Sequence, residues 1–458
     1  MNQEDAGESH FQMERVPSDV LEDIFHFASP NGAINDTLSL SHVSRSWRVV
    51  CLGQRALWLT IRVKLGADFD TARKYWSTMR RRTRGAGVTI EISDMHSDAD
   101  PILWWIQASP VLFGSLKNIH AVSVTLLSTT KPLPVLKVLR HIPVSYHTLI
   151  IHGFAIKLPN ESRVEVCMEE IYAISPDIKR IELHSMNFFL KSVFARLPVE
   201  ELVIHVPDFE TSRTFIDGIL VQCPHLRILE IIDGKDPEDT YFGTLLSSPT
   251  APAKLESFVV DRMPHMLYSS RLNQPCILPC LTKLLVHRPD RDRSKIIAFV
   301  RENPTIVECG FTFAWETVES SRKAQWLTLE DLAGVAPQMK TLHIFAKYCN
   351  YDFVLLLDEF NTQRTKNPSS FFPNLVTLHL DDIPFLSKVL FEDLVQACYP
   401  TALPGASSSA TLTEFSVKFK DTARENEKME WTQSEYLQRA EIYKMQARAQ
   451  AAWHVSWS

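Results

Sequence analysis

The segment Phe215–Ile231, FIDGILVQCPHLRILEI, decides the fold of this chain. Its first part carries apolar pairs at helical spacing, which predicts a helix with one buried face. Pro224 then stops the helix, because proline lacks a backbone N–H and restricts the residue before it. The pattern Leu226-x-x-Leu229-x-Ile231 follows and alternates like a strand with one buried face. A helix, a proline turn and a short strand together form the unit of an α/β solenoid.

The same strand pattern recurs through most of the chain. Full copies begin at Ile119, Ile178, Val199, Leu226, Leu255, Leu281, Met339, Leu375 and Leu412, and weaker copies begin at Tyr146 and Ile306. Val88–Ile92 is predicted to be the first strand of the series. The copies recur at intervals of about 21 to 37 residues, against about 20 to 29 in regular leucine-rich repeats. The pattern therefore predicts stacked parallel strands with an irregular repeat length.

A different pattern fills Val16–Val63, ahead of the repeats. Pro17 suits a first helical turn, where the missing N–H is not needed. Leu21, Ile24 and Phe25 then share one helical face, and a second helix with a Leu-Trp pair after it is predicted further on. A unit this short has too little core to hide every apolar side chain, so part of its apolar surface needs a partner.

This stretch resembles the F-box, a small helical module. The positions that match its usual motif are Pro17, Leu21, Ile24, Phe25, Leu40, Val43, Arg45, Trp47, Arg48, Leu57 and Trp58. It departs from that motif at Val16, Asp19, Val20 and Ser44. An ordinary N-terminal helical hairpin is the alternative. The repeats in turn resemble the leucine-rich repeats often found behind an F-box, although the Asn or Cys that follows their strands is mostly absent.

The resemblance implies that the F-box docks onto a Skp-family adaptor and, through it, onto a cullin. The residues implied to bind the adaptor are Pro17, Leu21, Ile24, Phe25, Leu40, Val43, Trp47, Leu57 and Trp58. The repeats would hold an unknown target protein, so the chain would be the substrate receptor of an SCF-type cullin–RING ubiquitin ligase. Two alternatives remain open: a scaffold that recruits no target for degradation, and an enzyme with its site on the repeats.

We therefore predict an α/β chain with four parts. They are a disordered N-terminus at 1–14, an F-box at 15–63, an irregular leucine-rich-repeat-like solenoid with parallel strands at 64–421, and a C-terminal helix at 422–458. The C-terminal helix is predicted from an apolar stripe over Thr422–Trp453, and it would cap the open end of the solenoid. An independent partner-binding helix is the alternative.

Another helix is predicted over Phe69–Arg82, and it ends in the basic run Arg80–Arg84. Cations favour a helix C-terminus, and the glycine that comes next at Gly85 suits the position after it. A nuclear import signal is the alternative use of the same basic run.

Composition excludes several function classes. The net charge of −6 gives no basic excess for binding nucleic acid, and the 14 glycines leave little room for glycine-rich phosphate loops. Eight scattered cysteines favour free buried thiols in a reducing compartment over disulfides. We expect no secretory signal, no transmembrane helix and no membrane partner, and hence a place in the cytoplasm, the nucleus or both.

No catalytic constellation is recognisable. The chain has no nucleophile elbow, Walker loop, dinucleotide fingerprint or His-Glu-x-x-His helix, so we predict no catalytic residue and no cofactor. Cys276 and Cys280 with His287 loosely resemble a metal site, but zinc needs about four ligands, and small buried thiols are the simpler interpretation. Asp381-Asp382 is a metal-binding pair or, more simply, a polar turn. We predict no metal site.

Six histidines fall on one face of the predicted strands: His152, His184, His205, His287, His343 and His379. Strand side chains alternate, so this face points away from the core, and neighbouring parallel strands lie about 4.8 Å apart. The first three are therefore predicted to form a column. We predict that these histidines bind acidic or phosphorylated groups of the target, more tightly as the pH falls through their ordinary pKa of about 6.5. Tolerance of histidine on an exposed strand and a zinc site are the alternatives.

Overall fold

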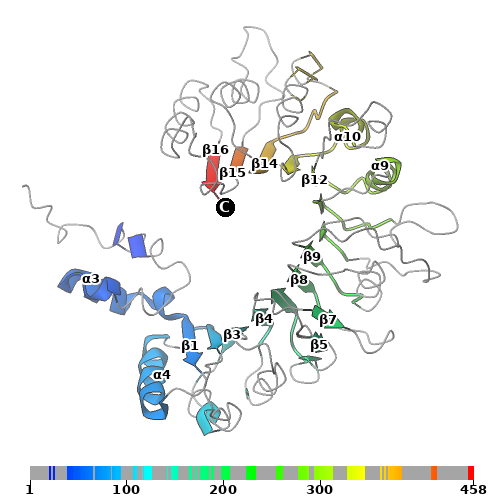
Figure 1. Ribbon diagram of the computed structural model, residues 1–458. Coiled ribbons are helices and arrows are strands. Elements are labelled where there is room, and N and C mark those ends of the chain that lie inside the picture. Colours follow the sequence, from blue (N-terminus) through cyan, green and yellow to red (C-terminus); the bar gives the residue numbers. More distant parts are fainter. Residues whose placement is uncertain are drawn as a thin grey trace, which may run out of the picture. The chain divides into compact units, whose positions relative to one another are not determined.

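The computed structural model (Figure 1) describes residues 20–21, 24–25, 39–64, 68–83, 85–93, 107–110, 116, 118–125, 142, 146–152, 165–167, 171–172, 176–184, 187–189, 198–206, 223–233, 254–260, 277–287, 293–312, 327–345, 360, 362–363, 366–367, 370–383, 414–419 and 452–457. These belong to two compact units, Met1–Ser192 with His205–Pro207, and Val193–Ile204 with Asp208–Ser458. Within the described ranges, no helix has the length and apolar character needed to cross a membrane.

The first unit begins with helices. Helix α3 covers Arg45–Gly53, the 3-10 helix η2 covers Arg55–Trp58, and helix α4 covers Phe69–Thr83. The α3 helix starts where the Ser44 hydroxyl accepts a hydrogen bond from the backbone N–H of Trp47 at 3.2 Å.

The predicted helix over Phe69–Arg82 is confirmed by α4, and Gly85 after it has a positive φ of 78°. The basic run at its end is partly structural. The Arg82 guanidinium donates to the carbonyl of Leu52 at 3.2 Å and lies 5.7 Å from the ring centre of Trp58.

Five parallel strands of the first unit pair in chain order. They are β1 (Thr60–Lys64), β2 (Val88–Ser93), β3 (Ile119–Thr125), β4 (Thr148–His152) and β6 (Arg180–His184). Buried side chains pair across them in one row, Ile61, Ile90, Val122, Leu149 and Ile181. Strands β5 (Glu165–Cys167) and β7 (Asn187–Phe189) form a separate parallel pair. Strand β1 begins inside the predicted F-box and was not predicted as a strand.

The second unit continues the pattern with parallel strands and helices. Its strands are β8 (Glu201–Val206, of which the last two residues group with the first unit), β9 (Ile228–Asp233), β10 (Ser257–Val260), β11 (Lys283–Val286), β12 (Glu308–Thr312), β13 (Thr341–Phe345), β14 (Thr377–Ile383), β15 (Glu414–Phe419) and β16 (Ala452–Trp457). Helix α9 covers Arg293–Glu302 and helix α10 covers Leu329–Val335. From β8 on, each strand pairs with the next along the chain.

A ladder of fully buried side chains runs across the second unit. Its paired members are Leu229, Phe258, Leu284, Cys309, Leu342 and Leu378. The turn before β12 shows how a helix is joined to this ladder. The buried amide of Asn303 donates to the carbonyl of Phe299 at 2.8 Å and accepts from the N–H of Leu278 at 2.6 Å. It thereby satisfies a carbonyl in the last turn of α9 and links the end of this helix to the turn before β11, while Pro304 prevents the helix from continuing.

The predicted α/β architecture with parallel strands is confirmed, and each predicted repeat strand is observed. The C-terminal prediction was wrong at its end. Ala452–Trp457 is strand β16, paired in parallel with β15, and not the end of a helix. The alternation of Trp453, Val455 and Trp457 suits a strand, and it outweighs the helical stripe in the residues before it. The rest of that predicted helix, and residues 1–14, lie outside the described residues.

Candidate functional site

The N-terminal helical segment has a small core of its own. Leu21, Phe25 and Trp47 are buried, and the rings of Phe25 and Trp47 meet edge to face with centroids 4.9 Å apart. Trp58 is also buried, and its indole N–H donates to the carbonyl of Cys51 at 2.8 Å. Because these side chains are buried, they hold the segment together and are not part of its surface.

Outside this core the segment exposes branched apolar side chains. Ile24 is 40% exposed, Val43 53% and Val49 67%. The nine residues predicted to bind the adaptor therefore differ in exposure. Ile24 and Val43 are exposed and Leu40 is half-buried, whereas the buried members are Leu21, Phe25, Trp47, Leu57 and Trp58. Pro17 lies outside the described residues. Ile24 and Val43 are thus the members able to meet a partner directly, and their role in binding stays a prediction.

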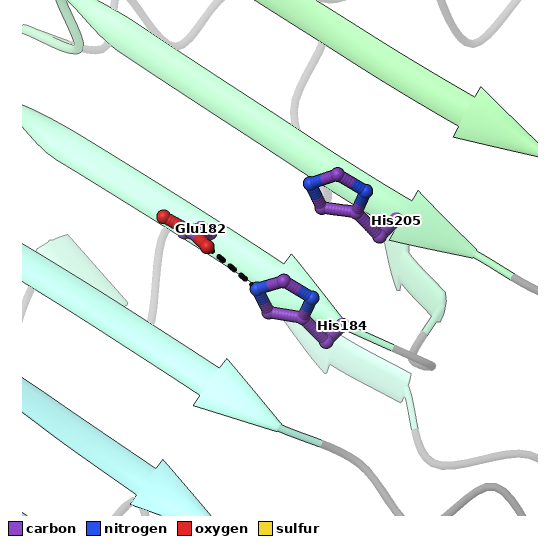
Figure 2. Close-up of side chains that lie close together, drawn as sticks. All are labelled: Glu182, His184 and His205. Carbon is purple, nitrogen blue, oxygen red and sulfur yellow. Dashed lines mark hydrogen bonds and ion pairs between the residues drawn. The ribbon is translucent and has the colours of Figure 1, made fainter. Parts of the chain in front are cut away.

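The first histidine column is present as predicted. His152 on β4 pairs in register with His184 on β6, and their rings stack with centroids 4.5 Å apart. The ring of His205 on β8 stacks on the other side of His184, at 4.7 Å and within 3° of parallel. Figure 2 shows His184 and His205 side by side on neighbouring strands.

Glu182, two residues before His184 on β6, was not predicted as part of this column. Its carboxylate accepts hydrogen bonds from Nε2 of His184 at 2.6 Å (Figure 2) and from the guanidinium of Arg180 at 3.2 Å. Burial alone would raise the pKa of Glu182, but the two hydrogen bonds outweigh burial and lower it. Burial, and then the neighbouring His184, lowers the pKa of His152.

A second column lies in the second unit. His343 on β13 pairs in register with His379 on β14, and their rings stack with centroids 4.3 Å apart. Both ring nitrogens of His343 face carboxylates, with Nε2 2.9 Å from Glu308 and Nδ1 3.3 Å from Asp381. The predicted polar pair at Asp381-Asp382 therefore contributes an ion-pair partner to His343 through Asp381.

Charge is concentrated around His343. Burial by itself lowers the pKa of His343, but hydrogen bonds to Asp381 and Glu308 outweigh burial and raise it. Burial also raises the pKa of Glu308, yet the hydrogen bonds from His343 and Lys283 lower it to about 2. Lys283 reaches Glu308 at 2.7 Å, so a lysine, two carboxylates and an imidazolium form one network.

This network predicts a pH-dependent contribution to stability. The raised pKa of His343 stabilises the fold fully below its ordinary value near 6.5, and this contribution is lost as the pH rises through the folded-state pKa. The lowered pKa of Glu308 stabilises the fold fully above its ordinary value of 4.5, and this contribution is lost as the pH falls toward about 2. His343→Gln is therefore expected to lower the free energy of unfolding by about 1–3 kcal/mol between these two ordinary values, and by less at higher pH.

Denaturant unfolding over a pH series measures this difference. His225→Gln, at an exposed turn, is the matched control and is expected to unfold like the wild-type chain. A loss of stability for His343→Gln that stayed the same from acid to alkaline pH would contradict the assignment.

An apolar cluster lies beside the second column, on strands β10, β11 and β13. Val259, Leu285 and Phe345 are buried together, and the ring of His287 lies 4.3 Å from that of Phe345. Between β11 and β13, Gly310 leaves room for these side chains. A Cβ there would lie 2.6 Å from Cδ2 of Leu285 and 2.7 Å from Cβ of His343.

The loosely suggested metal site at Cys276, Cys280 and His287 gains no support among the described residues. Cys280 is exposed, which contradicts the interpretation of it as a buried thiol, because it lies at the tip of a turn before β11. Cys276 lies outside the described residues, and His287 instead contacts Phe345. Other thiols are buried as expected, including Cys223 and Cys309.

Comparison with known proteins adds one family. Residues 13–64 match the F-box-like family. This is a family of adaptor-type interaction modules. No curated protein sequence matches this chain. A crystal structure of a protein from Bacteroides fragilis aligns over 73% of this chain and 71% of its own, with 9% identity and a TM-score of 0.26, which is too weak to support any inference.

Proposed function

We propose that this chain is the substrate-recognition subunit of an SCF-type cullin–RING ubiquitin ligase. Its F-box-like segment would bind a Skp-family adaptor, as F-box domains generally do, and the adaptor would bring the cullin. The observation that supports this best is the exposure of Ile24 and Val43, two motif positions of the matched segment. So small a unit cannot bury every large apolar side chain, and those that it leaves exposed are available to a partner.

In this proposal the chain contributes position and not chemistry. A target held on the rigid strands would lie near the conjugating enzyme that the cullin recruits. This proximity raises the effective concentration of the target at the conjugating enzyme. The buried thiols are poor nucleophiles, because burial raises the pKa of Cys51 to about 11 and that of Cys223 to about 12. Such a subunit would act in the cytoplasm, the nucleus or both.

The target-binding surface would be the strand face that carries the histidines. In the first unit it combines the imidazoles of His152, His184 and His205 with the guanidinium of Arg180, which suits acidic or phosphorylated groups. In the second unit, His287, His343 and His379 lie on the corresponding face. The alternative is a scaffold that binds the adaptor through the same segment but delivers no target for degradation.

The test is to replace His152, His184 and His205 together with alanine and to purify the full chain from cells with degradation blocked. We expect the variant to lose its target proteins, seen as ubiquitylated species by mass spectrometry, while it retains the adaptor and the cullin. The variant His225→Ala, on an exposed turn, serves as the control and is expected to keep the full set. An unchanged target set, with the fold intact by circular dichroism, would exclude a binding role for the column.

A further inference from the structure

The residues Glu182, His184 and His205 form a compact group of metal-ligating side chains (Figure 2). Glu182 and His184 stand two positions apart on β6, so they lie on one face, and His205 stands on β8 against the ring of His184. All three belong to the first unit. We propose that they bind one divalent transition metal ion, with zinc as the occupant.

The distances are those of a site that closes when the ion enters. The ligand atoms of the three side chains all lie within 4.8 Å of one another. Ligands at about 2.0–2.2 Å from a tetrahedral zinc lie roughly 3.3 Å apart, so a contraction of about 1.5 Å is enough. The rings of His184 and His205 are within 3° of parallel, and their nitrogens must turn to converge. That rotation about the Cβ–Cγ bond is soft, because this torsion has broad minima in histidine.

The donor set selects the class of metal. Two imidazole nitrogens and one carboxylate oxygen suit zinc and its first-row neighbours, whereas calcium and magnesium prefer oxygen alone. The Glu182 carboxylate offsets part of the charge of the ion. The side chains of His184 and Glu182 are 27% and 19% exposed, so an ion can enter from solvent and keep a fourth position for water or for an atom of a bound molecule.

Both histidine columns hold a carboxylate with a nearby cation, Lys283 beside Glu308 in the second column and Arg180 beside Glu182 in the first. The cation therefore does not distinguish the two columns, and Arg180 has to share Glu182 with a bound metal ion. What favours the first column is the short distance between its ligand atoms. Among the residues that the structure describes, no other group of three or more such side chains meets the same distance condition.

Bound zinc would tie β6 to the end of β8. The ion would also have an open coordination position on the strand face. A bound molecule could fill this position with a carboxylate or phosphate oxygen or with an imidazole nitrogen. The inference stands on the three side chains alone, and it does not depend on adaptor binding.

The experiment uses the full chain, stripped of metal by chelation and titrated with zinc against a chromophoric chelator. We expect one zinc ion per chain at micromolar or lower concentrations. Glu182→Gln, His184→Gln and His205→Gln are each expected to weaken binding by about 100-fold or more. His225→Gln, at an exposed turn outside the group, is the control and is expected to bind zinc like the wild-type chain.

Cobalt provides a second readout that does not depend on affinity. Replacing zinc with cobalt(II) should give visible absorption bands of a nitrogen- and oxygen-ligated ion, without the near-ultraviolet charge-transfer band of thiolate ligands. Zinc binding that survives all three substitutions, or a thiolate band, would place the ion elsewhere and overturn the assignment. No zinc binding by the wild-type chain at micromolar concentrations would also overturn it.

Discussion

Replacing Ile24 and Val43 together with aspartate is expected to weaken adaptor binding by at least about 100-fold. Both side chains are exposed in the free chain, so the substitutions leave its buried core in place. In the complex they would put two unpaired carboxylates into an apolar interface, at a cost of roughly 1.5–3 kcal/mol each. Because about 1.4 kcal/mol corresponds to a factor of ten, two such penalties give the expected loss. Isothermal titration of the purified chain with a Skp-family adaptor measures it.

The choice of these two residues follows from the structure. Leu21 matches the F-box motif equally well, but it is only 2% exposed, and Leu21→Ala would destabilise the segment itself by about 2–5 kcal/mol. The matched control is Ile277→Asp, which places the same charge on an apolar side chain 63% exposed in the second unit. It should bind the adaptor like the wild-type chain. Undiminished binding by Ile24→Asp/Val43→Asp would show that the adaptor does not use this surface.

Gly310→Ala is expected to destabilise the second unit by about 3 kcal/mol. The new methyl group would lie 2.6 Å from Cδ2 of Leu285, 2.7 Å from Cβ of His343 and 2.8 Å from Cε2 of Phe345. The Leu285 and Phe345 atoms can move with their side chains, whereas Cβ of His343 is fixed to the backbone of β13. Crowding of this kind in packed regions typically costs about 1–3 kcal/mol, and here three contacts are violated together. Denaturant unfolding of the purified chain gives the value.

Gly334→Ala is the matched control for this substitution. Gly334 lies in helix α10, is exposed, and has nothing within 4 Å of the position of a Cβ. Alanine is the better helix former, so this variant should be as stable as the wild-type chain or more stable by about 1 kcal/mol or less. Equal stability of Gly310→Ala and the wild-type chain would mean that β11, β12 and β13 do not pack as described.

The repeat strands could be predicted because their signal is local. In Leu342-His343-Ile344, for example, the alternation of buried and outward residues is set by the strand itself, with a period of two. The same alternation predicts that all six histidines lie on one face, and this prediction requires no information about residues on other strands. Stacking of His184 between His152 and His205 then follows from strand spacing alone.

The partners of these histidines could not be predicted in the same way. Glu308 lies 35 positions before His343 and Asp381 lies 38 after it, and they meet only through the register of three neighbouring strands. Gly310 is likewise unremarkable in sequence, since its role depends on side chains from strands on either side. Glu182 was within reach of prediction, because a carboxylate two residues before a strand histidine shares its face.

The division of the N-terminal motif into core and surface also required the structure. Leu21 and Ile24 both carry large apolar side chains in the F-box motif, yet Leu21 is 2% exposed and Ile24 40%. Strand β16 was missed for a different reason. A long helical stripe ahead of it was extended across Trp453, although the alternating aromatic and branched residues from there on indicate a strand.

The most direct test of the proposed function is reconstitution from the purified chain, a Skp-family adaptor and a cullin, with the mass of the complex measured by light scattering. The proposal predicts a single complex that contains one copy of each protein and that fails to form with Ile24→Asp/Val43→Asp. A complex of chain and adaptor that excludes the cullin would favour the scaffold alternative. Absence of any complex with the adaptor would contradict the function proposed for the F-box-like segment.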